Sequence, residues 1–114
     1  MKWYVAKLVF QILNNSKIQQ FDEQLRLISA LDYNEAFINA NEIARTDENE
    51  FIDLYNNKVV WKFKAITYLS EVDILKNGTE LCSQIIEKKP EENFLNSIKL
   101  KQEEIISKVT NTIE

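Results

Sequence analysis

The side chains in this chain that could take part in acid–base or metal chemistry are almost all carboxylates and lysines. Its 114 residues include no histidine, one cysteine, Cys82, and one glycine, Gly78. Without histidine there is no ordinary proton shuttle at neutral pH, no Ser-His or Cys-His nucleophile pair and almost no route to a zinc site. One glycine cannot build the glycine-rich loops that hold phosphate groups. We therefore predict a nonenzymatic protein with no catalytic residue and no cofactor.

The most acidic segment, residues 47–53, has the sequence DENEFID and opens like a calcium-binding loop. An EF-hand loop needs an oxygen ligand at its fifth position, glycine at its sixth and a bidentate glutamate at its twelfth. Those positions hold Phe51, Ile52 and Lys58, so we predict no metal site. Carboxylate pairs elsewhere have no spacing that distinguishes them from solvated charges, which leaves a carboxylate- or metal-dependent enzyme as the least favoured alternative.

Charge and composition limit the possible partners. The formal net charge is −4 and the pI is about 5.0, whereas nonspecific binding to nucleic acid or to an anionic membrane needs an excess of cations. We predict neither partner. Hydrophobic residues make up 45% and charged residues 28%, which is ordinary for one globular domain, here residues 1–114. The N-terminal MKWYVAKLVF alternates, unlike the continuous apolar centre of a signal peptide, so we expect a cytoplasmic protein.

The apolar centre of the chain is residues 59–75, VVWKFKAITYLSEVDIL, which alternates like a strand. The alternation changes phase near Ala65 and Ile66. A β-bulge there would keep both halves on one core, whereas an unbroken strand would bury its two halves on opposite faces. We favour the bulge.

The Asn77-Gly78 pair that follows predicts a tight type I′ turn. Residues 59–76 and 79–87 would then form a hairpin, with residues 79–87 as the last strand. In that hairpin Cys82 would lie beside Asp73, where a carboxylate neighbour does not activate a thiol. We expect an inert cysteine.

Three further segments read as strands. Residues 3–13 and 21–31 alternate and are predicted to pair antiparallel, and residues 50–55 form a short strand turned by Asn56 and Asn57. Both faces of 3–13 are largely apolar. This pattern fits a strand buried from both sides, or a strand whose second face lies in a subunit contact.

Two segments have helical spacing. Asp32 and Glu35 form a capping box that predicts a helix ending near Thr46, with alanines on its apolar stripe. The second helix is predicted at about 90–112 and could cover the chain's own sheet or a partner's. We favour the chain's own sheet, because a polar residue, Gln102, interrupts this stripe: Leu95, Ile98, Gln102, Ile105 and Val109.

Together these elements predict the α+β class. The sheet is curved and antiparallel, the order is β-β-α-β-β-β-α, and two helices pack on the sheet. The core would lie within residues 3–87, followed by the C-terminal helix.

Five pieces of the sequence, read together, resemble a bacterial family known as domain of unknown function 4288. They are WYVAKLVF at 3–10, FDEQLRLISA at 21–30, the helix EAFINANEIA, VVWKFKAI at 59–66 and NGTELCS at 77–83. The resemblance covers about residues 3–87 and leaves the C-terminal helix as an extension. The family often has glycine in the turn where this chain has Asn56-Asn57. The resemblance implies no activity, so it transfers no catalytic residue.

The family's most recognisable polar positions fall on Asp22, Glu23, Gln24 and Arg26. A structural alternative is that Glu23 and Arg26 only form a cross-strand pair. Tryptophan side chains are frequent anchors of protein interfaces, although most are core residues. The binding residues that we predict are therefore these five: Trp3, Glu23, Gln24, Arg26 and Trp61.

We hypothesise a small binding or protein-interaction module that associates with itself, as a homodimer, or with another protein. The two-sided first strand is the reason to expect self-association. An antidote that blocks a toxin or nuclease is a second hypothesis, because the chain is small and acidic and lacks catalytic motifs.

Overall fold

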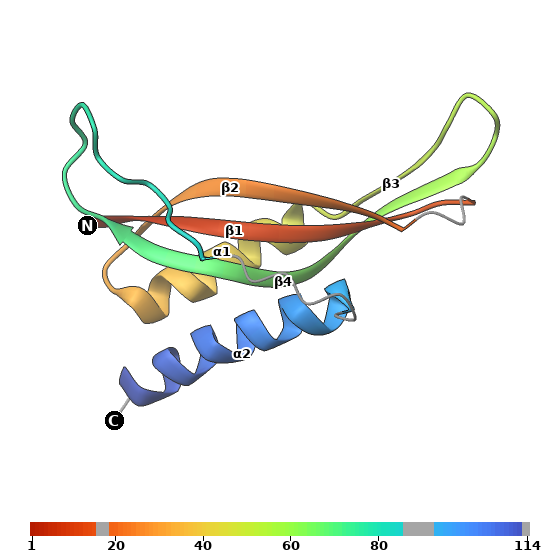
Figure 1. Cartoon of the computed structure of the whole chain (residues 1–114). Coiled ribbons are helices and arrows are strands. Elements are labelled where there is room, and N and C mark those ends of the chain that lie inside the picture. The colour runs from red at the N-terminus through yellow and green to blue at the C-terminus, as the bar shows by residue number, and fades with distance from the viewer. Residues whose placement is uncertain (16–18, 86–92, 113–114) are drawn as a thin grey trace.

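The first strand lies in the middle of the sheet. The computed structural model describes residues 1–15, 19–85 and 93–112, and Figure 1 shows a curled sheet with two helices. The strands are antiparallel and lie in the order β2-β1-β4-β3, which confirms the α+β class. The elements are β1 (Lys2–Leu13), β2 (Gln20–Ala30), α1 (Tyr33–Thr46), β3 (Asn49–Ile52), β4 (Lys58–Val72) and α2 (Phe94–Thr112).

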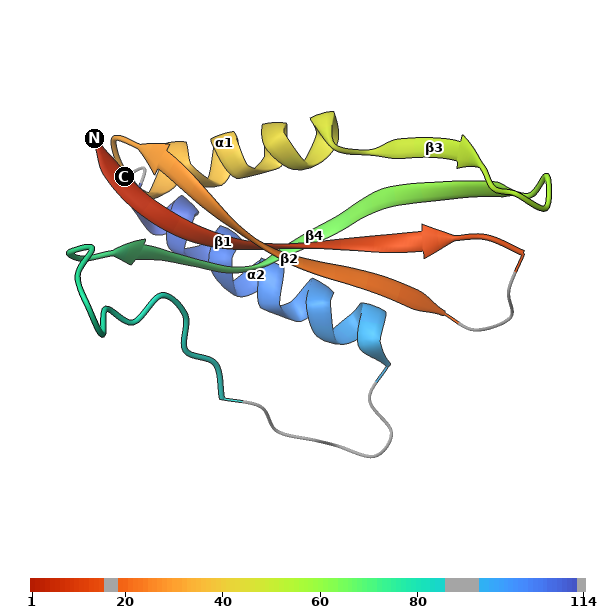
Figure 2. The same ribbon diagram turned by 90° about the horizontal axis from the view of Figure 1, so that it is seen from above.

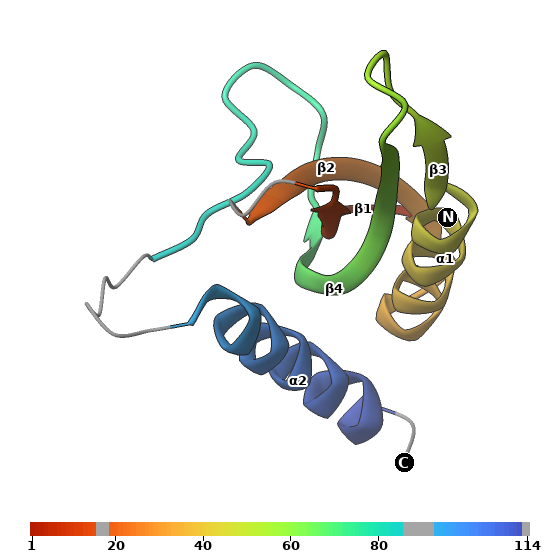
Figure 3. The ribbon, with the colours of Figure 1, turned by 90° about the vertical axis from the view of Figure 1, so that its right-hand side faces the viewer.

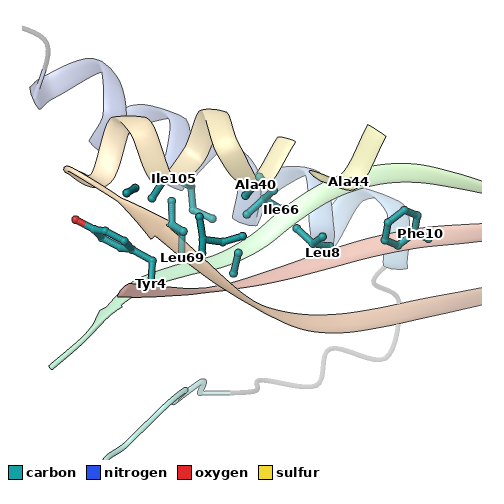
Figure 4. Close-up of a cluster of buried hydrophobic side chains, with 12 residues drawn as sticks. Tyr4, Leu8, Phe10, Ala40, Ala44, Ile66, Leu69 and Ile105 are labelled. Atoms are coloured by element: carbon teal, nitrogen blue, oxygen red, sulfur yellow. The ribbon is translucent and has the colours of Figure 1, made fainter. Parts of the chain in front are cut away.

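Both faces of β1 are covered by the chain itself. The even-numbered side chains of β1, including Leu8 and Phe10, face α1 on what we call the inner face; Figure 4 shows them pointing toward Ala40 and Ala44. On the other side, the outer face, Val9 packs with residues of β4 and α2. Of the two explanations for the apolar first strand, burial from both sides within one chain is the one observed.

Helix α1 lies close to the inner face because its contact stripe is made of alanines. Ala36, Ala40 and Ala44 are fully buried, and small side chains let the helix axis approach the sheet. The Asp32 side chain accepts a hydrogen bond from the Glu35 amide at 2.8 Å, as the capping box predicts. The predicted end at Thr46 is also confirmed.

Strand β4 contains two bulges where the sequence predicted one. Its register with β1 shifts between Lys7 and Leu8 and again between Val9 and Phe10. Thr67 and Lys64 are the extra residues of β4 at these two points, on either side of the predicted site at residues 65–66. Each extra residue changes which side chains face the core. Residues from both halves of β4 therefore share the inner face, and the unbroken-strand alternative is wrong.

Helix α2 covers the part of β4 that has no strand beside it. In the described chain β3 pairs with β4 only from Lys58 to Trp61. Helix α2 begins over the outer face, where Ile98 packs with Val9, and continues to the inner-face core, where Ile105 is buried; Figure 3 shows it crossing below β4 toward α1. The helix therefore packs on its own sheet, as favoured, and it shields an exposed strand edge.

Gln102 is the contact that fits α2 to the bulged strand. Its Oε1 accepts a hydrogen bond from the Ile66 amide at 2.6 Å. Ile66 lies directly beside the bulge residue Thr67, where the strand ladder is disrupted and an amide needs another partner. The polar residue that interrupts the apolar stripe of α2 thus satisfies a buried backbone group.

The predicted hairpin after β4 is wrong. A turn forms at Lys76–Thr79, but only Gly78 has positive φ, 88°, whereas a type I′ turn needs it at both central residues. The Thr79 hydroxyl bonds to the Ile74 carbonyl and so competes with a strand ladder. Strand β4 ends at Val72, residues 79–85 form no strand, and Cys82 is not paired with Asp73; the remainder of the predicted strand, 86–87, lies outside the described residues.

Residues 80–85 instead run along the side of the sheet opposite α1, as Figure 2 shows from above. Lys7 Nζ donates to Gln84 Oε1 at 2.6 Å, and the Ser83 amide donates to the Tyr68 hydroxyl at 3.4 Å. These contacts join the segment to β1 and β4 through side chains, because no ladder is present.

The short third strand is confirmed with shifted bounds. It is β3, Asn49–Ile52, followed by a turn in which Asp53 Oδ1 accepts from the amides of Tyr55 and Asn57. Asn56 takes positive φ, 64°, a conformation that asparagine tolerates better than most residues. The second helix starts at Phe94; the earlier part of its predicted range, 90–92, lies outside the described residues.

The Gln102 contact predicts a stability effect. Gln102→Leu removes the acceptor of the Ile66 amide and should lower the free energy of unfolding by about 1–3 kcal/mol, whereas Gln102→Glu keeps an acceptor and should lose less. Urea denaturation measures both variants. Hydrogen exchange at the Ile66 amide should accelerate in the leucine variant. A leucine variant as stable as the parent would show that the bulge amide does not depend on this side chain.

Tyr33 predicts a pH effect. Its hydroxyl is buried without a hydrogen-bond partner among the described residues, and burial raises the pKa of this phenol above its usual 10.0. The folded state therefore favours the protonated form, so the stabilisation is complete below pH 10 and is lost as the pH rises through the folded pKa. Tyr33→Phe should be as stable as the parent at pH 7, or more stable by up to about 1 kcal/mol. It should also lose less stability between pH 9 and pH 11, measured by thermal unfolding.

Candidate functional site

Strand β2 carries three of the five predicted binding residues, Glu23, Gln24 and Arg26. Because side chains alternate along a strand, these three do not all lie on the same face. Gln24 and Arg26 lie opposite Leu8 and Ala6 of β1, so they share the inner face. Glu23 lies opposite Val9 and belongs to the outer face. The predicted pair between Glu23 and Arg26 is therefore wrong, because their side chains leave opposite sides of the sheet.

The inner-face side chains form a continuous chain of hydrogen bonds from Trp61 to α1. Trp61 Nε1 donates to Asp22 Oδ2 at 3.3 Å, and Gln24 Nε2 donates to the same oxygen at 2.6 Å. Arg26 donates to Gln24 Oε1 from Nε at 3.0 Å and from Nη2 at 2.7 Å. Arg26 Nη2 also meets Asp47 Oδ2 at 2.5 Å. We call these residues the inner network: Asp22, Gln24, Arg26, Asp47 and Trp61.

This network joins β2, β4 and the end of α1. Asp47 is the C-cap of α1, where a negative charge is unfavourable beside the helix carbonyls, and the Arg26 guanidinium offsets that charge. The two side chains are 36% and 38% exposed, so the ion pair contributes modestly. Each carboxylate accepts from a neighbour in the network. The arrangement therefore holds three elements of the fold together.

Aromatic side chains extend the inner network toward β3. Phe51 stacks on Trp61 with ring centroids 5.8 Å apart and an interplanar angle of 25°. The Arg45 guanidinium lies over the Phe63 ring, 6.0 Å from its centroid. Sequence reasoning missed Asp47 and Phe51 as site residues, because the acidic segment suggested only solvated charge. No local signal relates Asp47 to Arg26, 21 residues earlier.

The outer face of β2 shows apolar side chains at a strand edge. Leu25 and Leu27 are 55% and 51% exposed. Trp3 is 44% exposed and lies opposite Ser29, diagonal to Leu27 on the same face. We call these residues, together with Glu23, the β2 edge patch. The structure thus divides the predicted binding residues in two: Gln24, Arg26 and Trp61 in the inner network, and Trp3 and Glu23 in the β2 edge patch.

The outer backbone edge of β2 is open over most of its length. Asn39 Nδ2 donates to the Ser29 carbonyl at 3.2 Å, which indicates that this carbonyl points away from β1. Backbone groups two residues apart point the same way in a strand, so Leu27, Leu25 and Glu23 also present their amides and carbonyls outward. Among the described residues, only the Asn39 side chain bonds to this edge.

The sequence of this chain matches a protein-family model. The family model described as Domain of unknown function (DUF4288) matches residues 3–83. The chain belongs to the DUF4288 family. Comparisons with curated proteins and with solved structures gave no significant match.

The family match covers β1 to β4 and the turn at Gly78, and ends before α2. The inner network and the β2 edge patch therefore lie within the matched part of this DUF4288 domain. Among the described residues, no three His, Cys, Asp or Glu side chains are grouped to hold a metal ion. None of the helices in the described ranges is long and apolar enough to cross a membrane.

A double-mutant cycle tests the inner network. Arg26→Met and Asp47→Asn should be coupled by at most about 1 kcal/mol, because both side chains are partly solvated. The coupling should shrink in 1 M salt, which screens exposed ion pairs. The measurement is urea unfolding of the parent, both single variants and the double variant.

The matched control is a cycle between Arg26→Met and Glu23→Gln. Glu23 also lies near Arg26 in sequence but leaves the other face of β2, so its coupling should be zero within error. A coupling to Glu23 as large as that to Asp47 would contradict the placement of Arg26 on the inner face.

Proposed function

We propose that this DUF4288 domain is a nonenzymatic protein-interaction module that self-associates by pairing β2 with β2 of a second copy. The observation that carries the proposal is the open outer edge of β2. Over 11 residues this strand contains no lysine and no proline, the residues that commonly protect edges. Its pairing with β1 has no register shift, so no bulge bends the edge away.

A second copy is the partner that fits this edge by symmetry. Antiparallel pairing of β2 with its copy about a two-fold axis perpendicular to the sheet joins two sheets into one. The outer faces then lie on the same side. Leu25 and Leu27 from both copies meet in one apolar cluster, with Trp3 beside it. On association, the half-exposed leucine side chains and the outward backbone groups of β2 would be buried together.

The apolar first strand suggested self-association through β1, whereas the present proposal places it at the outer edge of β2. Strand β1 has a strand on either side and both faces covered. Strand β2 has a free edge.

The nonenzymatic part of the proposal rests on the chemistry of the side chains. The chain contains no histidine, and the carboxylates of the inner network are already hydrogen-bonded to their neighbours. A cytoplasmic location is part of the same proposal, since a lone free cysteine, Cys82, suits a reducing compartment. No observation on the described residues favours the antidote or the carboxylate enzyme.

Sedimentation equilibrium, or size-exclusion chromatography with light scattering, tests the dimer. The parent should show a mass that rises with concentration from 13.4 kDa toward twice that value. The Leu25→Lys/Leu27→Lys variant places charge on the paired edge and should remain monomeric. Leu54→Lys is the matched control, because Leu54 is fully exposed on a remote turn, and should dimerise like the parent.

Leu25→Pro gives an independent test. The Leu25 amide points outward, so proline should remove a donor needed only between copies and should leave the β1–β2 ladder intact. Circular dichroism checks that each variant is folded. A parent that stays monomeric at high micromolar concentration would contradict the proposed dimer. Dimers that form equally well in both edge variants would contradict it too.

A further inference from the structure

The Asn77-Gly78 pair lies in an exposed turn that follows β4. The Thr79 amide donates to the Lys76 carbonyl at 3.2 Å, which closes a four-residue turn with Asn77 and Gly78 at its centre. Gly78 has positive φ, 88°, and Asn77 does not, which is the combination found in a type II turn. Both central residues are exposed. The peptide bond between them is therefore held on either side and is accessible to water.

The backbone amide of Gly78 has no partner that holds it in place. Among the described residues it donates no hydrogen bond, in contrast to the amide of Thr79. A Cβ built on Gly78 would meet no atom within 4 Å other than those of its chain neighbours, so the fold leaves open space around this part of the backbone. Glycine also permits wide rotation about its backbone bonds. The Gly78 nitrogen can therefore approach the Asn77 side chain when the peptide plane rotates.

We infer that Asn77 is a site of spontaneous deamidation. Hydroxide removes the Gly78 amide proton, and the nitrogen attacks Cγ of Asn77. The N–Cγ bond forms, the Cγ–Nδ2 bond breaks, and the released amide group takes a proton from water and leaves as ammonia. Water then opens the resulting five-membered succinimide. Addition of water at Cγ gives aspartate, whereas addition at the main-chain carbonyl gives isoaspartate, whose backbone runs through Cγ.

Either product changes the charge of the turn, and isoaspartate also changes its backbone. A carboxylate is added to a chain whose formal charge is already −4. Lys76, the preceding residue, lines a hollow together with Glu71, Asp73 and Glu80, so the new charge enters an acidic surface. Isoaspartate lengthens the backbone between Lys76 and Thr79 and should weaken the hydrogen bond that closes the turn. The site shares no residue with the β2 edge patch, so it is independent of self-association.

The turn after β3 provides a comparison within the same molecule. Asn56 is also exposed, but the amide that follows it, that of Asn57, donates to Asp53 Oδ1 at 2.9 Å. That nitrogen is therefore engaged. Asn57 also carries a side chain, which hinders the approach of its own nitrogen to the Asn56 side chain. Asn56 should therefore deamidate more slowly than Asn77.

Incubation of the folded protein at neutral pH and physiological temperature, followed by peptide mapping with mass spectrometry, tests the site. Residue 77 should gain the mass difference between an amide and an acid at least about tenfold faster than Asn56. Part of the product should be isoaspartate, which an isoaspartate methyltransferase labels. Isoaspartate is diagnostic because direct hydrolysis of the side-chain amide gives aspartate alone.

Two variants and a matched control complete the test. Asn77→Gln keeps an amide side chain but would have to close a six-membered ring, so residue 77 should not react in the same time. Gly78→Ala should slow the reaction by about tenfold or more; because alanine is strained at this φ, circular dichroism checks that the variant is folded. The control, Asn56→Gln, should leave the rate at Asn77 unchanged.

Three outcomes would each overturn the inference. In the first, Asn77 reacts no faster than Asn56. In the second, the product at residue 77 contains no isoaspartate. In the third, folded Gly78→Ala reacts as fast as the parent.

Discussion

A strand that is apolar on both faces cannot lie at a surface, and this constraint on β1 determines the arrangement of the other elements. Leu8 and Phe10 are fully buried on one side and Val9 on the other, and burying each such side chain contributes roughly 1.5–3 kcal/mol. One face is covered by α1, whose alanines permit a close approach. On the other, α2 packs with Val9, and residues 80–85 form hydrogen bonds with Lys7 and Tyr68. Helix α2 therefore has to cross from the outer side of the sheet to the inner core.

The two bulges of β4 make this crossing possible. Extra residues at Lys64 and Thr67 bend the strand and increase its twist, so that a single helix passes from the outer face to the inner core. A bulge also leaves an amide without its ladder partner. The side chain of Gln102 satisfies that amide at Ile66, and the position of α2 along its axis is thereby defined by a hydrogen bond as well as by apolar packing.

Local patterns predicted the elements whose determinants are local. The cap at Asp32, the alanine stripe and the alternation of β1 and β2 each depend on residues close in sequence. The predicted hairpin at Gly78 is wrong because only Gly78 has positive φ in this turn and the Thr79 hydroxyl accepts a hydrogen bond within it. The Asn-Gly pair alone does not reveal this other turn. The inner network could be predicted only in part. Alternation places Gln24 and Arg26 on one face, but Asp47 joins them only after α1 packs on the sheet.

The edges of β2 and β4 are protected to different degrees. At the β4 edge, α2 covers the bulged region, where the Gln102 side chain accepts from the Ile66 amide. This helix lies beyond the part of the chain that matches the family model. At the β2 edge, which lies within that part, only Asn39 reaches the backbone among the described residues. A free strand edge beside exposed leucines favours pairing with another strand, whereas an edge covered by a helix cannot extend the sheet.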